Sequence, residues 1–413
     1  MRMGLSRGVA VVGGGMTRFH HRIHQDKTSR ELFVEAAAEA MDSVDNGITL
    51  DDVEALYVGN FSNDAFEKQA HTGALMADWL GLAPRAATRI EDACASSGVA
   101  VNVGVLAVAS GAYDVVMVGG VEKMRTLSTD EVTDTLAMAA DAYYEVGAGF
   151  TFPGLYAAIA SAHFAEHGST WEQLAAITIK NHHNGTLNPK AHYQAEVIDT
   201  AARLGERRGM TFGDEMEFLR SDINAVVAHP LRIFDCCPIS DGASVVILAS
   251  EKVAKRFTDT PVHIRGIGQA SDTMALHDRS DITTLMATRF AAEQAYKMAR
   301  VGAPDIDVAD VHDCFTIGEV LATEDLGFFA KGEGGKAAAE GRTALDGDMP
   351  INPDGGLKAK GHPVGATGAA MVYEMYKQLR GEAGEHQVAD AYLGLAQNVG
   401  ASGATVSVQV FGR

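Results

Sequence analysis

The sequence is poor in cysteine, proline and positive charge. Its four cysteines, Cys94, Cys236, Cys237 and Cys314, are too few and too scattered for a disulfide framework, and no Cys-x-x-Cys pair indicates a structural zinc site. We therefore expect a protein of a reducing compartment, namely the cytoplasm. Only 34 Lys and Arg residues accompany 54 Asp and Glu residues, which gives a net charge of −20. Such a surface argues against nucleic acid or an anionic membrane as the main partner.

Long apolar runs are also rare. The longest stretch without a charged residue, residues 93–113, is long enough to span a membrane, but its Ser, Asn and Gly residues favour a helix buried in a protein core. Residues 8–15 have the pattern of a buried strand that runs into a glycine turn, and they do not resemble a signal peptide. We therefore expect no membrane span. With 46% hydrophobic residues, the 413-residue chain can bury a large core.

The pattern of strands and helices repeats once, at an interval of about 255 residues. Residues 8–15 and 262–268 both have the sequence pattern of a strand that ends in glycine. Each is followed by an amphipathic helix and then by a second strand, at residues 50–58 and 306–311. The repeat predicts two similar α/β halves, each a layered unit of strands and helices.

Domain boundaries follow from this repeat. The first half is predicted to comprise residues 1–125, with residues 226–260 returning to it, and the second half residues 261–413. Residues 126–225 are richer in His, Tyr, Thr and charge and fit neither half. We expect them to form an inserted loop domain that covers the active site, because segments inserted between packed halves usually cover a site.

Cys94 is the first candidate for a catalytic residue. It lies in the segment Asp92-Ala-Cys-Ala-Ser-Ser-Gly98, between a short strand and the start of the apolar helix. A helix N-terminus lowers the pKa of a nearby thiol and offers backbone N–H groups to an oxyanion. Taken alone, this position suits a catalytic nucleophile or an inert buried cysteine.

Two histidines and a second cysteine stand at matching places in the second half. His362 lies in Gly361-His-Pro-Val-Gly-Ala-Thr-Gly368, just before the helix that matches the one after Cys94. The repeat therefore brings Cys94 and His362 toward one interface, and a His beside a Cys is the usual arrangement for making a thiolate. In His312-Asp-Cys-Phe315, alternation along a strand points His312 and Cys314 to the same face.

Other patterns point to metals or nucleotides less convincingly. His163-Phe-Ala-Glu-His167 matches a zinc-peptidase pattern, but no third ligand stands out. His20, His21 and His24 lie in a polar segment, where we expect a solvated cluster. The glycine turn of residues 13–15 lacks the third glycine of a dinucleotide fingerprint, and no phosphate-loop lysine is present. We expect no metal and no nucleotide cofactor.

Taken together and in this order, the motifs resemble those of the thiolase superfamily over nearly the whole chain. Many thiolases carry Asn-Glu-Ala-Phe and Cys-x-Gly where this chain has His312–Phe315 and Asn398-Val-Gly400. The sterol-carrier-protein-type and archaeal-like subgroup shows the same exchange. The motifs that carry the resemblance are Ala93-Cys-Ala-Ser-Ser-Gly98, Gly119-Gly-Val-Glu-Lys-Met124, Ser240-Asp-Gly-Ala243, His312-Asp-Cys-Phe315, Gly361-His-Pro-Val-Gly-Ala-Thr-Gly368 and Asn398-Val-Gly400.

The resemblance implies a five-layered αβαβα fold and a reversible Claisen reaction on coenzyme A thioesters. It implies that His362 takes the proton of Cys94, which attacks an acyl thioester and holds the acyl group. Cys314 replaces the acid/base that Asn398 cannot provide and moves the proton at the substrate α-carbon. His312 is implied to bind the thioester oxygen, and the backbone N–H groups of Cys94 and Gly400 to form the oxyanion hole.

The resemblance also implies acyl-CoA and CoA as ligands, without a bound cofactor. CoA contacts are expected from the loop domain 126–225 and from residues 236–244. A homodimer or a dimer of dimers is expected, and a small zinc-ribbon/OB-fold protein is a possible partner. Three alternatives stay open: a degradative thiolase for a branched, long-chain or aryl 3-oxoacyl-CoA, a ketoacyl or hydroxymethylglutaryl-type synthase, and a non-catalytic lipid or acyl-CoA-binding scaffold.

Overall fold

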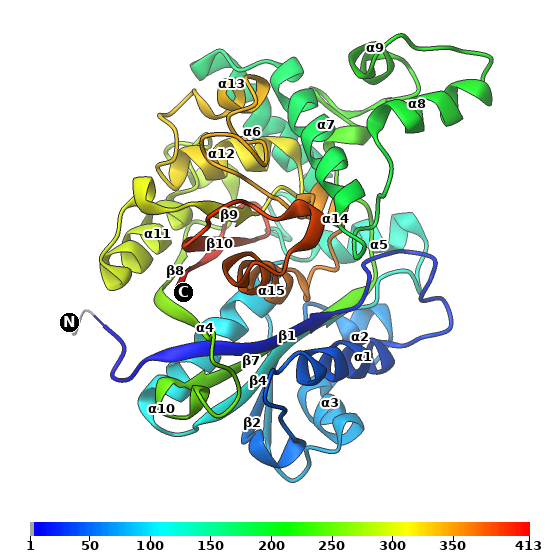
Figure 1. The fold of residues 1–413 in the computed structure, drawn as a ribbon. Helices are drawn as coiled ribbons and strands as arrows, with labels where there is room; N and C mark the ends of the chain where they lie inside the picture. The colour runs from blue at the N-terminus through cyan, green and yellow to red at the C-terminus, as the bar shows by residue number, and fades with distance from the viewer. Residues whose placement is uncertain (1–3) are drawn as a thin grey trace.

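The computed structural model describes residues 4–413. Nine strands form one continuous mixed sheet that crosses the molecule in the order β3-β2-β4-β7-β1-β8-β11-β10-β9 (Figure 1). A two-stranded ribbon, β5-β6, lies apart from it. The strands are β1 (Val9–Met16), β2 (Ala55–Gly59), β3 (Ala86–Ile90), β4 (Val115–Glu122), β5 (Val226–Ala228), β6 (Leu231–Arg232), β7 (Gly242–Ser250), β8 (Val262–Ser271), β9 (Val308–Val311), β10 (Leu393–Gly400) and β11 (Thr405–Gly412).

The repeat seen in the sequence is a repeat of structure. Strands β2-β4-β7-β1 of the first half correspond to β9-β10-β11-β8 of the second, and both sets begin with a parallel pair followed by antiparallel pairs. The halves meet where β1 pairs with β8, with Ala10 opposite His263. Single 3-10 turns, Leu50–Asp52 and Ala303–Asp305, precede the second strand of each half.

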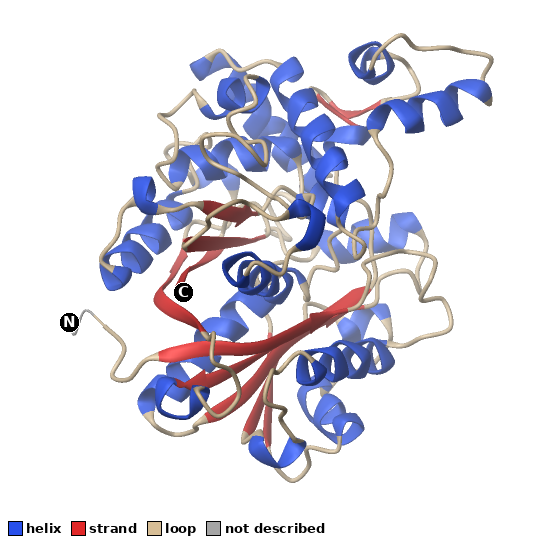
Figure 2. Ribbon diagram, viewed as in Figure 1, coloured by secondary structure: helices blue, strands red, loops and turns tan. Residues whose placement is uncertain are grey.

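Helices complete a five-layered αβαβα arrangement, which confirms the expected fold class. Helices α4 (Ser96–Ser110) and α15 (Thr367–Arg380) pack against each other between the two halves of the sheet. Helices α1 (Ser29–Asp42) and α3 (Thr72–Leu80) cover the outer face of the first half, and α11 (Met286–Ala299) covers that of the second (Figure 2). Two shorter helices are α2 (Asn63–Phe66) and α10 (Glu251–Ala254), of which α10 contacts β7 and β1.

Helix α4 is the apolar segment that is long enough to span a membrane, and in the structure most of it is buried in the core. Glycine allows α4 and α15 to approach closely at their N-termini. A Cβ at Gly368 would lie only 2.2 Å from the Gly98 nitrogen, so α15 has no room for a side chain at this crossing. The close crossing brings together the segments that precede the two helices, and these carry Cys94 and His362.

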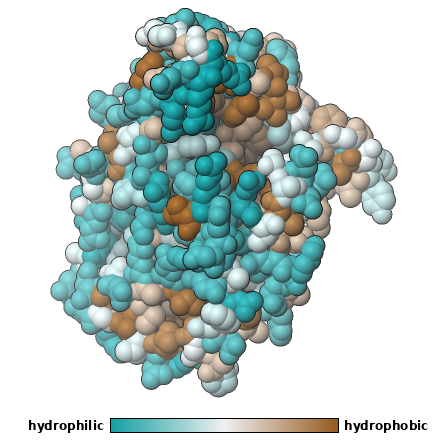
Figure 3. Space-filling view, turned by 90° about the vertical axis from the view of Figure 1, so that its right-hand side faces the viewer, coloured by the Kyte–Doolittle hydropathy of each residue, from teal (hydrophilic) through white to brown (hydrophobic). Residues whose placement is uncertain are grey.

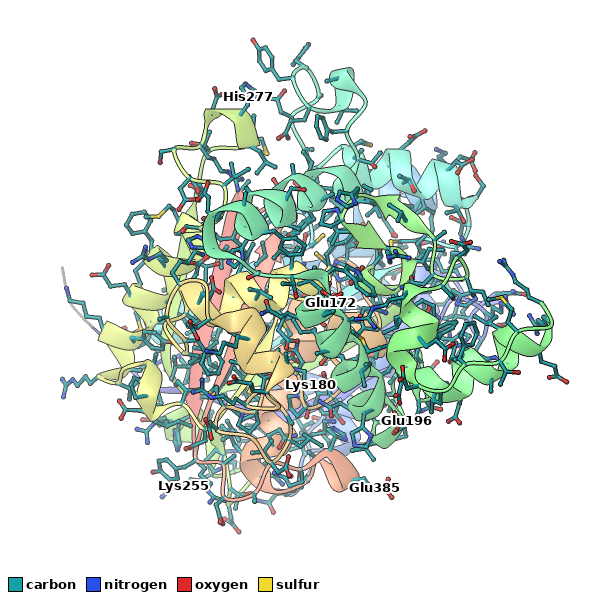
Figure 4. The ribbon with its side chains drawn as sticks, turned by 90° about the horizontal axis from the view of Figure 1, so that it is seen from above. Glu172, Lys180, Glu196, Lys255, His277 and Glu385 are labelled. Carbon is teal, nitrogen blue, oxygen red and sulfur yellow. The ribbon has the colours of Figure 1, made fainter. Side chains whose placement is uncertain are left out.

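Residues 126–225 form five helices above this crossing. Helices α6 and α7 pack against the helices of the second half, and Glu172 and Lys180 mark α7 in the view from above (Figure 4). Helices α8 and α9 project as an arm that shares a small core with α7, and the face below this arm has an apolar hollow (Figure 3). The helices are α5 (Thr129–Ala137), α6 (Phe152–His167), α7 (Trp171–Leu187), α8 (Val197–Glu206) and α9 (Glu215–Arg220), with α12 (Thr316–Asp325), α13 (Gly334–Ala339) and α14 (Gly356–Lys360) beside them.

Candidate active site

Cys94 lies in a tight turn between β3 and α4. The preceding residue, Ala93, has a φ of 49°, a left-handed conformation that costs free energy for a residue with a side chain. Ser96 stabilises the turn, because its hydroxyl donates to the Ala93 carbonyl (2.6 Å) and accepts from the Asp92 N–H (2.9 Å). The strained turn therefore holds the cysteine directly ahead of the central helix.

The structure brings three of the predicted residues to one point. A sulfur and two ring nitrogens, from Cys94, His312 and His362, lie within 4.8 Å of one another. The two imidazole rings are nearly perpendicular, at 85°, with centroids 5.0 Å apart. Cys94 comes from the first half, and both histidines come from the second. The interface between the halves thus assembles a thiol with two imidazoles.

The hydrogen bonds of His362 fix its tautomer. Its Nδ1 lies 2.7 Å from the Thr367 hydroxyl oxygen, and this hydroxyl donates its own proton to the Pro363 carbonyl (3.0 Å). The hydroxyl must therefore accept a proton from Nδ1, which leaves a lone pair on Nε2. Nε2 is buried and has no hydrogen-bond partner among residues 4–413. Burial, with a smaller contribution from Lys360, lowers the pKa of His362 to about 3, so the ring is a neutral proton acceptor.

The hydrogen bonds of His312 fix the opposite tautomer. The side-chain amide nitrogen of Asn398 lies 3.1 Å from His312 Nδ1 and donates to it. The proton of the neutral ring is therefore on Nε2, which is buried and lacks a hydrogen-bond partner within the described part of the chain. Burial, and then the neighbouring His362, hold the pKa of His312 well below its usual value. His312 is thus a neutral hydrogen-bond donor aimed into the site.

The Cys94 thiol differs from the sequence expectation. We expected the helix N-terminus to lower its pKa, but burial raises it to about 12, and the carboxylates of Glu122 and Glu91 add to the shift. The backbone N–H of Ala401 donates to the sulfur and opposes the shift without reversing it. Burial outweighs the helix terminus because taking a thiolate out of water costs more than a partial dipole charge returns. Cys94 therefore needs a base to release its proton.

Cys314 lies on the same pocket as Cys94, next to a residue that the sequence did not indicate. It is buried, and burial raises its pKa well above the ordinary thiol value. The Tyr156 hydroxyl forms a hydrogen bond with the Cys314 thiol and donates to the Ala401 carbonyl (3.0 Å). The Tyr156 ring stacks on Phe315, with centroids 4.6 Å apart. Tyr156 comes from α6, in residues 126–225, whose packing over the site has no local sequence signal.

An apolar pocket of about 150 Å³ opens onto these residues. This volume is roughly ten times the space that one buried water needs. Four of its lining residues are the cysteines of the chain, and the other walls come from β-strand ends and from α5 and α6. The lining residues are Cys94, Met124, Thr133, Leu136, Phe152, Pro153, Tyr156, Cys236, Cys237, Pro238, Ile239, Cys314, Phe315, His362, Val364 and Ala401. The pocket suits a hydrocarbon group attached to a reacting carbonyl.

Gly400 lies beside the turn that carries Cys94. A Cβ at Gly400 would come within 2.8 Å of the Asp92 carbonyl oxygen, so the strand approaches the turn closely there. The next residue, Ala401, has a φ of 56° and is the one whose N–H contacts the Cys94 sulfur. The sequence indicated this glycine-rich segment, but it did not predict the contact between the Ala401 N–H and the Cys94 sulfur.

The other histidine patterns have structural partners. His163 Nε2 lies 3.0 Å from a carboxylate oxygen of Glu324 and does not join a metal cluster with His167 within residues 4–413. The expectation of a solvated cluster at the N-terminal histidines holds only in part, because His20 and His21 are partly exposed whereas His24 is buried. His20 and His21 pack against His192, which comes from residues 188–194.

Comparisons with known proteins agree with this geometry. The model of the thiolase N-terminal domain matches residues 9–252, and that of the thiolase C-terminal domain matches residues 268–413. The chain is 46% identical to an acetyl-CoA acetyltransferase of Methanothermobacter thermautotrophicus, over 98% of this chain and 100% of the relative. It is 30% identical to sterol carrier protein 2 of Gallus gallus, over 97% of this chain and 71% of that protein.

Among solved structures, an Ltp2-ChsH2(DUF35) aldolase has the same fold, with a TM-score of 0.81 at 24% identity, covering 98% of this chain and 97% of the other. The two family models between them match most of the sequence and separate the strands as the structural repeat does. A cysteine before the central helix of one half and a histidine before that of the other occupy the interface of a five-layered fold. The chain therefore belongs to the thiolase family.

Proposed function

We propose that this thiolase is an acyl-CoA:acetyl-CoA C-acyltransferase that makes or cleaves a 3-oxoacyl-CoA through an acyl group on Cys94. One observation carries the proposal. The Cys94 sulfur lies next to two neutral imidazoles, of which one is a proton acceptor and the other a hydrogen-bond donor. The relative that is 46% identical is named an acetyl-CoA acetyltransferase, and this activity belongs to the same reaction class as the one we propose.

In the first half-reaction, His362 Nε2 takes the proton of Cys94 while the sulfur attacks the acyl thioester carbonyl. The raised pKa of the thiol makes this transfer necessary, because little thiolate exists before the base acts. Backbone N–H groups of Cys94 and Gly400 stabilise the oxyanion. Cys314, which lines the same pocket, gives its proton to the departing CoA thiolate. The products are acyl-Cys94, CoA, protonated His362 and the Cys314 thiolate.

In the second half-reaction, the Cys314 thiolate removes a proton from the α-carbon of acetyl-CoA. His312 Nε2–H donates to the thioester oxygen, where negative charge develops as the α-proton leaves. The α-carbon then attacks acyl-Cys94, and His362 returns its proton to the Cys94 sulfur. Every group is back in its starting state after one turnover, and no metal or redox cofactor takes part.

The apolar pocket supports a hydrocarbon acyl group. Thr133 and Leu136 of α5 and Phe152 of α6 line this pocket together with Cys94, so we propose that they contact the acyl chain. We propose that these residues belong to an inserted domain, 126–225, that contacts CoA together with residues 236–244. A cavity of about 150 Å³ is large enough to hold a benzene ring, so the pocket admits acyl groups from acetyl up to about that size.

We further propose a homodimer or dimer of dimers in the cytoplasm, in which a small zinc-ribbon/OB-fold protein is a partner. The four free cysteines suit a reducing compartment. The Ltp2-ChsH2(DUF35) neighbour, a two-component assembly by its description, supports a search for such a partner. Size-exclusion chromatography with light scattering tests the oligomeric state.

The decisive test is mass spectrometry of the intact protein after incubation with acetyl-CoA. We expect one acetyl adduct, on Cys94, in the wild type and none in Cys94→Ala. Thiolysis rates for acetoacetyl-CoA, a long-chain and an aryl 3-oxoacyl-CoA then define the acyl group. Binding of acyl-CoA without an adduct or turnover would instead support a scaffold, and release of free CoA with formation of a 3-hydroxy-3-methylglutaryl product would support a synthase.

A further inference from the structure

The backbone of His362 is held by a hydroxyl that lies outside the pocket. The His362 N–H lies 3.3 Å from the Ser240 hydroxyl oxygen and donates to it. Ser240 donates its own proton to the Pro238 carbonyl (3.2 Å). It also lies 2.9 Å from Nδ1 of His192, so it must accept from this nitrogen. The Ser240 oxygen therefore joins His192 to the backbone of His362.

The second ring nitrogen of His192 also has a hydrogen-bond partner. Its Nε2 lies 2.7 Å from Nδ1 of His21, and because Nδ1 of His192 carries the proton, Nε2 accepts from His21. The chain of hydrogen bonds thus runs from His21 through His192 to Ser240. It requires a neutral His192. Burial, followed by the neighbouring His20, His21, Arg18 and Lys358, lowers the pKa of His192 to about 2 and keeps the ring neutral.

Backbone contacts hold the same segment. The His192 N–H donates to the Lys360 carbonyl (2.9 Å), and the Tyr193 N–H donates to the Ala359 carbonyl (3.0 Å). Between Lys360 and His362, Gly361 has a φ of 110°, and a Cβ there would lie 2.7 Å from the Ser240 oxygen. The backbone before His362 is therefore enclosed between the segments that carry His192 and Ser240.

His20, His21 and His192 are arranged as in a metal site, because their possible ligating atoms lie within 4.8 Å of one another. The hydrogen bonds favour a different interpretation. His21 and His192 bond directly to each other, His192 to Ser240, and Nδ1 of His20 accepts from the Arg22 N–H (2.9 Å). These bonds occupy the lone pairs of His192 Nε2 and His20 Nδ1, which leaves a free lone pair only on Nε2 of His21, too few for a metal ion. The cluster is thus a hydrogen-bonded support.

We propose that His192 and Ser240 are positioning residues that hold His362 at the distance from Cys94 at which it accepts the thiol proton. Neither residue lines the pocket, so their effect on the reaction passes through His362. The proposal rests on the proposed function of Cys94 and His362. It adds that His192, which lies within residues 126–225 and far from His362 in the sequence, helps to set the position of His362.

The test compares His192→Leu with His192→Asn, because the Asn amide nitrogen replaces the Nδ1 donor to Ser240 and Leu does not. We expect His192→Leu to slow acetylation of Cys94 by roughly 10- to 100-fold, the effect of leaving a buried hydrogen-bonding group unpaired. KM for acetyl-CoA should change less than twofold. His192→Asn should restore most of the rate. Ser240→Ala should resemble His192→Leu, and the double variant His192→Leu/Ser240→Ala should be no slower than either.

Alkylation of Cys94 by iodoacetamide as a function of pH gives a readout that is independent of turnover. The His192→Leu profile should shift toward that of a variant without the His362 imidazole, while His277→Asn, at an exposed site on the periphery (Figure 4), should match the wild type. Wild-type acetylation and alkylation rates in both His192→Leu and Ser240→Ala would overturn the proposal. So would equal losses in His192→Leu and His192→Asn. A wild type that is never acetylated refutes the proposed function, whereas the alkylation comparison still decides the positioning role.

Discussion

His312 and His362 lie with their rings perpendicular and carry their single ring protons on different nitrogens. His362 is protonated at Nδ1 by virtue of Thr367, and His312 at Nε2 by virtue of Asn398. Both rings are neutral because burial lowers both pKa values. Two residues of the same type thus place an acceptor and a donor beside the Cys94 sulfur. Neither can replace the other, since each tautomer is set by a different neighbour.

The first prediction concerns the tautomer of His362. Thr367→Val removes the hydroxyl that accepts from Nδ1–H, while Thr367→Ser keeps it. We expect Thr367→Val to slow acetylation of Cys94 by roughly 10- to 100-fold, because a buried N–H loses its acceptor and the reactive tautomer loses its support. Thr367→Ser should stay within a few-fold of the wild type. Stopped-flow measurement of CoA release tests this, and equal rates in the two variants would count against the assigned tautomer.

The second prediction concerns the tautomer of His312. Asn398→Asp places a carboxylate where the amide donates, so Nδ1 of His312 takes the proton and Nε2 becomes an acceptor. The enolate oxygen then loses a donor, for which we expect a loss of roughly 10²- to 10³-fold in α-proton exchange. Acetylation of Cys94 should persist. Deuterium incorporation into acetyl-CoA and the mass of the adduct separate the two steps.

Cys314→Ala separates the two half-reactions in another way. We expect acetyl-CoA still to acylate Cys94, although more slowly because Cys314 no longer protonates the leaving CoA. The variant should form no carbon–carbon bond and exchange no α-proton. Deuterium wash-in at the wild-type rate would remove Cys314 from the mechanism and leave His312 or a water as the acid/base. Tyr156→Phe, which removes only the hydroxyl beside Cys314, should slow exchange and spare acylation.

The raised pKa of Cys94 predicts a distinctive pH dependence. In His362→Ala no imidazole takes the proton, so alkylation depends on the small thiolate fraction. Because the thiol pKa is raised to about 12, this fraction and the rate should rise about tenfold per pH unit from pH 7 to 10, without a plateau. The wild-type rate should vary much less over this range, since neutral His362 accepts the proton throughout. A rate that levels off above about pH 9 in the variant would show an ordinary thiol.

Stability depends on a buried charge cluster just ahead of His362. Lys360 is fully buried and forms ion pairs with Asp310 (2.9 Å) and Asp354. Lys360→Met should lower the free energy of unfolding by about 3–5 kcal/mol, because it leaves two buried carboxylates without their cation. Lys336→Met, at an exposed position, should change it by less than about 0.5 kcal/mol. Urea unfolding of both variants provides the comparison.

The sequence predicted the features that repeat. The glycine turns, the apolar helix and the matching strands recur in both halves, and the repeat alone brought Cys94 toward His362. What it did not predict depends on packing between distant segments. Tyr156 reaches Cys314 only because α6 folds over the pocket, and His192 reaches Ser240 because residues 188–194 fold back. The pKa of Cys94 was predicted in the wrong direction, because local position near a helix suggests the dipole whereas burial is a property of the whole fold.

The crossing of α4 and α15 at Gly98 and Gly368 has an evolutionary consequence. Each half contributes one helix and one reactive side chain ahead of it, yet the two side chains differ, a thiol in one half and an imidazole in the other. If the halves descend from a single ancestral unit, a symmetric pair of that unit would have carried two identical groups at this interface. Fusion into one chain removed the requirement of identity. Each copy could then acquire its own half of an acid–base pair, while the close crossing of the helices still left no room for a side chain at Gly368.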